Sequence, residues 1–272
     1  MTSQGMTTQA DRIAELDDPA GNLEALVRAR AGTDGREHTI WWSGDVYSQV
    51  PGEDTRRLFG FVGFNVARAV RVDGGYDLLT REAAFYLDPV TREIVETWRN
   101  PFTGEDVEVL HVWNDPVNQR FRLESPYGPW HAPYTDLGET VVFNLDIPIS
   151  APSALPVAEW PKNSAGDVYR AMELFQFYAP RAGLLDPAVA SVRCDVSWMR
   201  LSAWLPWMEM AQRPGGLVFH CRGAKLDSYD DLPAGVRAYV GKHHPEYAHA
   251  PEEFTAPNET SWTYFKKTRR PS

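Results

Sequence analysis

Between Phe59 and Phe121, runs of hydrophobic residues alternate with short polar breaks that contain proline or glycine. Proline and glycine fix tight turns, and the β-branched and aromatic residues between them are typical of strands. Connections this short join antiparallel neighbours, so the pattern predicts an up-and-down meander. The breaks stand at Asp73-Gly74-Gly75, Asp88-Pro89, Asn100-Pro101 and Asn114-Asp115-Pro116.

Alternation within the predicted strands assigns side chains to two faces. Phe61 and Asn65 share one face of their strand, and Val109, His111 and Trp113 share one face of theirs. Neither face of these strands is purely polar. This favours a mainly β chain whose antiparallel sheet is closed or strongly curved and is covered on its outside by other segments.

The remaining segments predict a few short helices and a second set of strands. Residues 1–35 are expected to form a helical lead-in that is partly disordered over residues 1–10. Residues 36–265 are expected to form a single β-barrel domain, and residues 266–272 a basic tail. Further strands are expected at His38–Val50 and Glu139–Ile149 and within Ala190–Leu226.

The clearest helical pattern lies near residues 166–179. Hydrophobic residues recur there at helical spacing, and Pro180 is a plausible stop. The stripe consists of Val168, Met172, Phe175 and Tyr178. A shorter helix is expected at Asp231–Gly241, and the WTYFKK run that begins at Trp262 is expected to be a last strand or a tail.

Charge and composition limit the classes of partner. The chain has 27 basic and 37 acidic residues and a net charge of −10, which argues against nucleic acid or an anionic membrane as the main partner. No run approaches the ~18 apolar residues of a membrane span, and no secretory signal is visible. Cys194 and Cys221 are therefore expected to be reduced core residues of a cytoplasmic protein.

Aromatic content is the unusual feature, with ten Trp, eleven Tyr and twelve Phe residues. Tryptophan suits both a large β core and a pocket for a flat ligand, and the sequence leaves both interpretations open. The chain has no Walker loop, no G-x-G-x-x-G after a strand, no G-x-S-x-G and no H-E-x-x-H. No cofactor is therefore expected, and a serine-hydrolase mechanism is disfavoured.

Two histidines are candidate acid–base residues. On the face of Val109 and Trp113, His111 would point into an apolar cavity, where a neutral imidazole acts as a base. The alternative is a core histidine that is hydrogen-bonded to a neighbouring strand. His131 lies in a proline-rich loop between Trp130 and Tyr134 and would reach a pocket if that loop were a lid, whereas a surface loop histidine is the simpler interpretation.

A second cluster comprises Arg200, Trp204, Trp207 and Glu209. A glutamate beside tryptophan has a raised pKa and can act as a general acid, but a structural ion pair between Glu209 and an arginine explains it equally well. His220 could pair with Glu209 across a Pro-Gly-Gly hairpin. The group His243, His244 and His249 favours an irregular loop over a zinc site, so no metal is expected.

Three runs together resemble a bacterial and fungal family, the domain-of-unknown-function family 1838. They are Thr97 to Glu105 (TWRNPFTGE), His111 to Asn118 (HVWNDPVN) and Arg213 to Gly216 (RPGG). The resemblance extends over most of the chain, roughly from His38 to Tyr247, and it implies no activity and no catalytic residues. The meander is also similar to calycin-like barrels, which include binders of hydrophobic molecules and enzymes that hydrate or cyclise them.

These observations favour a cofactor-independent lyase, hydratase or isomerase that acts on an apolar, aromatic or terpenoid-like substrate inside a barrel. The predicted catalytic residues are His111, His131, Glu209 and His220. The predicted substrate-binding residues are Trp98, Trp113, Asn65, Tyr134, Trp204, Trp207 and Arg200. The alternatives are a non-catalytic binding protein for a hydrophobic small molecule and a protein whose aromatic surface forms a homodimer.

Overall fold

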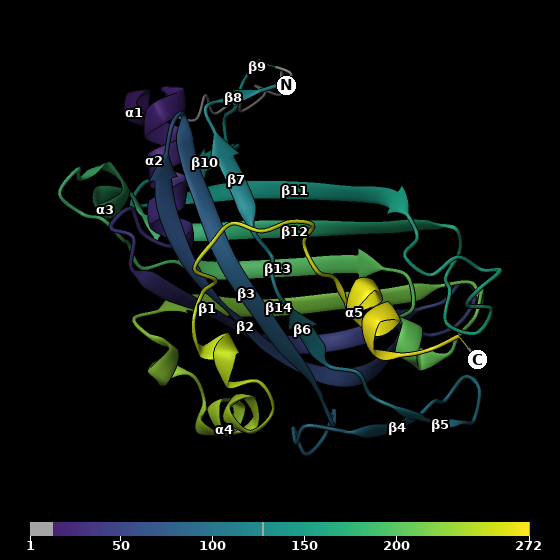
Figure 1. The fold of residues 1–272 in the computed structure, drawn as a ribbon. Helices are drawn as coiled ribbons and strands as arrows, with labels where there is room; N and C mark the ends of the chain where they lie inside the picture. Colours follow the sequence, from purple (N-terminus) through teal and green to yellow (C-terminus); the bar gives the residue numbers. More distant parts are fainter. Residues whose placement is uncertain (1–12, 127, 272) are drawn as a thin grey trace, which may run out of the picture.

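The computed structural model describes residues 13–126 and 128–271 (Figure 1). The disorder predicted for residues 1–10 lies outside these ranges. The helices are α1 Ala14–Asp17, α2 Pro19–Arg30, α3 Arg181–Leu185, α4 Ala234–His243 and α5 Ser261–Thr268. The strands are β1 Glu37–Gln49, β2 Arg56–Val72, β3 Gly75–Leu87, β4 Thr97–Arg99, β5 Asp106–Glu108, β6 Val112–Asn114, β7 Gln119–Arg122, β8 Glu124–Ser125, β9 Gly128–Pro129, β10 Tyr134–Asp136, β11 Thr140–Pro152, β12 Val168–Pro180, β13 Asp195–Ser202 and β14 Gly216–Leu226.

A large antiparallel sheet dominates the structure, and the prediction of a mainly β chain with few helices is confirmed. The sheet has the strand order β10-β11-β12-β13-β14-β1-β2-β3-β6, and β7 also pairs with β3. Figure 1 shows the sheet bending round, so that β2 and β3 cross in front of β12 and β13 at a steep angle. Among the described residues, no strand pairing joins β10 at one edge to β6 or β7 at the other.

The predicted meander is correct in part. Strands β1, β2 and β3 pair in sequence order, as the short turns between them require. Next along the chain, β4 and β5 form a separate two-stranded hairpin, and β6 and β7 each pair with a different part of β3. The strand predicted before the Asn114-Asp115-Pro116 break, which carries Val109, His111 and Trp113, is therefore interrupted between β5 and β6.

The prediction of a helix near residues 166–179 is wrong, because this segment forms the strand β12. It pairs along its whole length with β11 and along most of it with β13. Phe175 and Phe177 lie on the same side of the strand with parallel rings, 5.7 Å between centroids, whereas Gln176 between them is exposed. Alternation therefore describes the segment better than the helical stripe did, and the aromatic residues favour a strand.

The other helix predictions have mixed outcomes. Helices α1 and α2 confirm the helical lead-in over the described residues, and α4 confirms the short helix expected near residues 231–241. The prediction of a last strand or tail from Trp262 is also wrong, because this run forms the helix α5. Thr260 begins it by accepting a hydrogen bond from the backbone of Thr263, the usual N-cap arrangement. The basic tail predicted for residues 266–272 therefore begins inside a helix.

Two hydrophobic clusters occupy the two sides of the sheet. The larger one lies inside the curve and includes α1 and α2, and the smaller one lies between the outer side of β2 and β3 and helix α4. Phe61 belongs to the first cluster and Phe64 to the second, so the alternation predicted for β2 is confirmed. Within the described part of the chain, no helix is both long and apolar enough to cross a membrane.

Candidate functional site

A cavity of about 440 Å³ lies inside the curve of the sheet. Its wall comes from β1, β2, β3 and β6 on one side and from β11, β12, β13 and β14 on the other. The last residue of α2 and the first residues of α5 complete the lining. Because strands far apart in the sequence contribute to it, the curvature of the sheet is what creates this cavity.

Three polar side chains form a row across neighbouring strands of the cavity wall. Glu82 on β3 is the direct pairing partner of Asn65 on β2 and of Asn114 on β6, so all three side chains lie on the same face. Nδ2 of Asn114 donates a hydrogen bond of 3.0 Å to Oε1 of Glu82. The buried Oδ1 atoms of Asn65 and Asn114 have no hydrogen-bond partner among the described residues.

The carboxyl group of Glu82 is electrostatically perturbed. Burial raises its pKa to about 7, the charge of Glu173 adds to this effect, and the hydrogen bond from Asn114 opposes it. A carboxyl group with this pKa exchanges protons near neutral pH, which is the property required of a general acid or base.

A second polar group lies on the opposite wall. Arg200 on β13 pairs directly with Glu173 on β12 and forms an ion pair with its carboxylate. Its other terminal nitrogen donates a hydrogen bond to the hydroxyl oxygen of Tyr169. Burial alone would lower the pKa of Arg200, but Glu173 and Tyr169 more than offset it, so the pKa is raised and the cation is held in place.

Aromatic rings form the apolar part of the wall. Trp198 is the centre of this group, with ring centroids 6.2 Å from Trp42 and Phe61 and 5.8 Å from Phe219. The indole Nε1 atoms of Trp42 and Trp198 are buried and have no hydrogen-bond partner among the described residues. The cavity therefore offers flat apolar surfaces together with polar groups that are free to bind a ligand.

The segment before α5 covers part of the cavity. Asn258 accepts a hydrogen bond from the backbone of Asn118 and donates one to its carbonyl, at 2.9 and 2.8 Å. At the start of α5, Trp262 packs on Tyr169 with 4.5 Å between ring centroids. This C-terminal segment, which crosses in front of the sheet in Figure 1, thus connects the edge near β6 to the wall formed by β12.

Two predicted site residues, Asn65 and Arg200, line this cavity. His111 does not line it. The imidazole of His111 is buried beside Phe85, Tyr86 and Tyr239, and its Nδ1 accepts a hydrogen bond of 3.2 Å from the backbone of Tyr86. Burial lowers its pKa to about 4. This environment is that of the core histidine which the sequence left open as an alternative.

The predicted tryptophans lie outside the cavity wall. Trp98 and Trp207 pack against each other and against Phe59. Trp204 is buried and donates a hydrogen bond of 3.0 Å to the carbonyl oxygen of Arg213. Trp113 lies in the smaller cluster near α4, whereas Val109 lies in the larger one, so these two residues do not share a face. His111 and Trp113 both contact Phe85 and Tyr239.

The remaining acid–base candidates are dispersed. His131 contacts the carbonyl oxygen of Leu16 at 2.6 Å, and the hydroxyl of Tyr134 donates to Asp17, so this part of the predicted lid packs on the N-terminal helices. Glu209 is exposed and follows the 3-10 turn Pro206–Met208 rather than lying on a strand, and His220 is exposed on β14. Neither residue lines the cavity.

The histidines near the C-terminus also have separate contacts. His244 lies 3.1 Å from Glu246, and His249 lies 3.1 Å from Glu37. Among the described residues, no group of three or more His, Cys, Asp or Glu side chains is arranged to hold a metal ion. Cys194 and Cys221 are free and buried, which confirms the prediction of reduced core residues.

Sequence reasoning missed Glu82, Glu173, Tyr169 and Arg30 in the cavity. Glu82 lies in a strand that the sequence identified, and alternation from Ala84 and Tyr86 would have placed it on the inner face. Glu173 and Tyr169 were assigned to a helix, so the strand face that they share with Phe175 and Phe177 was not recognised. A charged residue on the inward face of a predicted strand was the sequence feature that could have identified these cavity residues.

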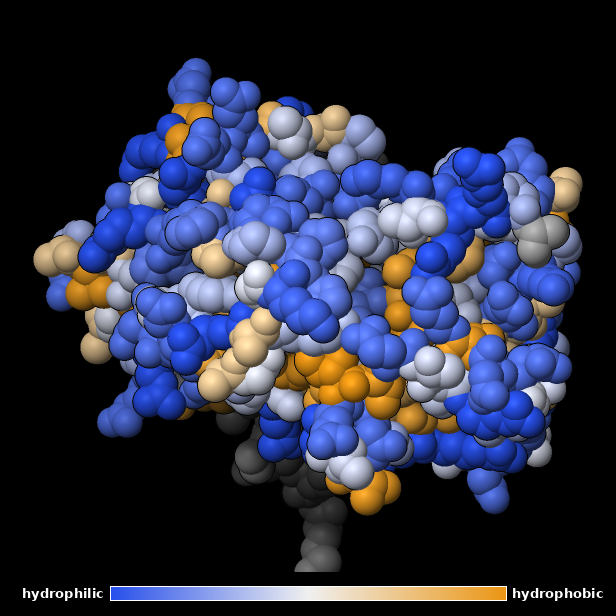
Figure 2. Space-filling view, turned by 60° about the horizontal axis from the view of Figure 1, so that its bottom comes forward, coloured by the Kyte–Doolittle hydropathy of each residue, from blue (hydrophilic) through white to orange (hydrophobic). Residues whose placement is uncertain are grey.

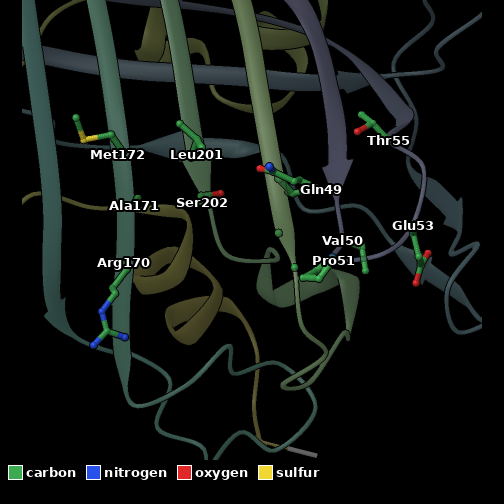
Figure 3. A pocket seen from close by; sticks show the side chains of 13 residues that line it. Gln49, Val50, Pro51, Glu53, Thr55, Arg170, Ala171, Met172, Leu201 and Ser202 are labelled. Carbon is green, nitrogen blue, oxygen red and sulfur yellow. The ribbon is translucent and has the colours of Figure 1, made fainter.

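A second hollow of about 660 Å³ lies at the ends of β1, β12, β13 and β14. Figure 3 shows its side chains spread around a wide opening, with Arg170 and Glu53 far apart. The carboxylate of Glu53 is already paired with Arg213, at 2.7 Å. Figure 2 shows apolar side chains in separate surface patches, some recessed between polar residues. The internal cavity is the stronger candidate.

The fold and cavity define a class: a mainly β protein whose curved antiparallel sheet encloses a pocket of mixed polar and aromatic character. The chain belongs to the DUF1838 family, a family of proteins of unknown function, whose model matches residues 35–269. The resemblance seen in the sequence is therefore confirmed and covers nearly the whole chain. A comparison with curated proteins gives no match.

Proposed function

We propose that this protein is a cofactor-independent lyase, hydratase or isomerase that acts on an apolar, aromatic or terpenoid-like small molecule in the internal cavity. The observation that carries the proposal is the Glu82 carboxyl group, which lines the cavity with its pKa raised to about 7. In this proposal Glu82 takes the acid–base role that the sequence analysis gave to His111.

The opposite wall supplies a partner for charge that develops on the substrate. Because the hydroxyl oxygen of Tyr169 accepts a hydrogen bond from Arg200, its own hydrogen is free to donate to a substrate oxygen. As Glu82 removes a proton from the substrate, an adjacent carbonyl oxygen would gain negative charge, and the Tyr169 hydroxyl would stabilise it. Glu173 holds Arg200 and so acts as a positioning residue.

We propose further that the sheet surrounds its ligand in the manner of a calycin-like barrel. The C-terminal segment and α2 would cover the space between the two sheet edges, in place of a strand pairing between them. The observation that supports this is the lining of one cavity by both halves of the sheet together with α2 and the start of α5.

A Glu82→Gln variant tests the catalytic proposal. The purified parent and the variant are each incubated with extracts rich in aromatic and terpenoid compounds, and mass spectrometry follows compounds that isomerise or that gain or lose water. The expected result is conversion by the parent and a loss of at least about a hundredfold in the variant, the scale of a general acid–base contribution. A Glu96→Gln variant is the matched control, since Glu96 does not line the cavity.

Equal conversion by parent and Glu82→Gln would overturn the catalytic role of Glu82. The aromatic wall around Trp198 also supports a second candidate, a non-catalytic binding protein for a hydrophobic small molecule. That function predicts retention of a ligand in native mass spectrometry without conversion, and loss of the ligand in Trp198→Ala but not in Glu82→Gln.

A further inference from the structure

Arg30 is a buried cation that has no anionic partner among the described residues. It is the last residue of α2, only 8% of it is exposed, and it lines the internal cavity. Its guanidinium carbon lies 5.1 Å from the ring centroid of Phe177. Among the described residues, no oxygen forms a hydrogen bond or ion pair with this guanidinium group.

The neighbouring arginine of the same helix shows the usual arrangement. Arg28 is also buried, but it donates a hydrogen bond of 2.8 Å to the carbonyl oxygen of Leu184 and lies 3.7 Å from Glu24. Buried arginines are normally paired in this way, because removing an unpaired charge from water costs several kcal/mol. Arg30 differs because it faces the cavity.

Three carboxyl groups line the cavity, and among the described residues none of them forms an ion pair with Arg30. Glu259 lies 3.4 Å from Lys267. Glu173 is held by Arg200, and Glu82 accepts the hydrogen bond from Asn114. The carboxyl groups near Arg30 are thus held by other side chains, and the guanidinium group has no direct counter-ion in the described part of the cavity. Burial lowers the pKa of Arg30, and the nearby carboxyl groups of Glu82 and Glu173 oppose this effect without contacting the guanidinium group.

We infer that Arg30 binds a carboxylate group of the ligand, so that the substrate is a flat, apolar molecule with a single negative charge. This inference rests on the proposed function, because it assigns a ligand to the same cavity. The ring of Phe177 lies against the guanidinium group, and the N–H donors at its edge can form two parallel hydrogen bonds to a carboxylate. A single unpaired cation matches a monoanion better than it matches a doubly charged phosphate.

Matched pairs of ligands test this inference without a known substrate. Isothermal titration calorimetry compares 2-naphthoate with 2-naphthamide and biphenyl-4-carboxylate with its primary amide. The parent protein is expected to bind each carboxylate at least about tenfold more tightly than its amide, the effect of one charge-assisted pair. Equal affinities, or tighter binding of 2-naphthyl phosphate than of 2-naphthoate, would overturn the inference.

Variants then assign the preference to Arg30. Arg30→Met is expected to bind both members of each pair equally, and Arg30→Lys is expected to retain part of the preference. Arg28→Met, which removes a buried arginine outside the cavity, should keep the full preference. A preference that survives in a folded Arg30→Met protein contradicts the inference, and the comparison of ligands on the parent does so even if this variant does not fold.

The outcome is separable from the catalytic proposal. Glu82→Gln should retain the preference for carboxylates, because Arg30 is unchanged in it. If the preference is absent while Glu82→Gln still abolishes turnover, the assignment to Arg30 fails and the catalytic proposal stands. If the preference is present and Glu82→Gln turns over normally, the catalytic proposal fails and the assignment of carboxylate binding to Arg30 stands.

Discussion

Asn114 donates a hydrogen bond of 3.0 Å to Glu82, its direct pairing partner across β3 and β6. The pairing fixes the carboxyl group on the cavity side of the sheet, where burial raises its pKa. The amide favours the ionised carboxylate and so limits the size of this increase. The two residues together therefore hold the Glu82 pKa near neutrality, where the proposed reaction needs it.

The raised pKa of Glu82 predicts a specific pH dependence of stability. Its folded-state pKa of about 7 lies above the usual value of 4.5, so folded protein binds an extra proton between these pH values. The free energy of unfolding therefore falls as the pH rises through this window. Glu82→Gln should leave stability similar below about pH 4.5 and increase it by up to about 3 kcal/mol above pH 7, as measured by urea unfolding.

Asn114→Leu provides the complementary variant. It removes the donor that favours ionised Glu82, so the pH window in which stability falls should move upward. A difference between parent and Glu82→Gln that is constant from about pH 4 to about pH 8 would contradict the raised pKa.

His111 predicts the opposite pH dependence. Its folded-state pKa of about 4 lies below the usual 6.5, so the unfolded chain takes up a proton first as the pH falls. The free energy of unfolding should decrease by up to about 3 kcal/mol between about pH 6.5 and pH 4. His111→Asn and His111→Phe should both lose this dependence, as measured by urea unfolding across the window.

The two substitutions at His111 also differ from each other. Asparagine retains an acceptor for the backbone N–H of Tyr86, whereas phenylalanine leaves that buried donor unpaired at a cost of about 1–3 kcal/mol. His111→Phe should therefore lose more through this hydrogen bond, although it keeps a ring in the aromatic cluster. An acid-induced loss that persists in both variants would show that another group is responsible.

Alternation and turn residues were sufficient to predict most of the sheet, because they are local properties of the chain. The inner face of β2 was predicted in the same way, so Asn65 was placed correctly beside Phe61. The β12 segment was mistaken for a helix because Val168, Met172 and Phe175 also satisfy helical spacing. Only its pairing with β11 and β13 decides between the two structures.

The candidate site was harder to predict because it depends on which strands face each other across the curve. Arg200 was recognised, but its partners Glu173 and Tyr169 come from the misassigned segment. Arg30 reaches the cavity from the end of a helix that the sequence identified without its orientation. Tryptophan content indicated aromatic packing correctly but did not distinguish the core around Trp207 from the cavity wall.

The strand assignment of β12 predicts opposite outcomes at adjacent positions. Phe177 is 1% exposed and stacks beside Phe175, whereas Gln176 points to solvent. Phe177→Ala should therefore cost about 3–5 kcal/mol of unfolding free energy, and Gln176→Ala less than about 1 kcal/mol. Thermal and urea unfolding measure both, and similar losses at the two positions would argue against the alternation.

The close packing around Gly63 leads to a prediction about the cavity wall. A Cβ atom at this position would lie 2.6 Å from Cε2 of Trp42 and 2.7 Å from the Cβ of Ala84. Since Trp42 lines the cavity, Gly63→Ala should displace its ring, destabilise the protein by about 1–3 kcal/mol and weaken the binding of 2-naphthoate. Calorimetry and urea unfolding measure the two effects.

A matched glycine gives the control for this substitution. Gly235 lies in α4 with no atom near the position of an added Cβ, so Gly235→Ala should stabilise the protein by about 0.5–1 kcal/mol through helix propensity. Combining Gly63→Ala with Trp42→Phe should cost less than the sum of the single changes, because the smaller ring relieves the contact. Strict additivity of the two changes would instead show that the ring of Trp42 does not carry the strain.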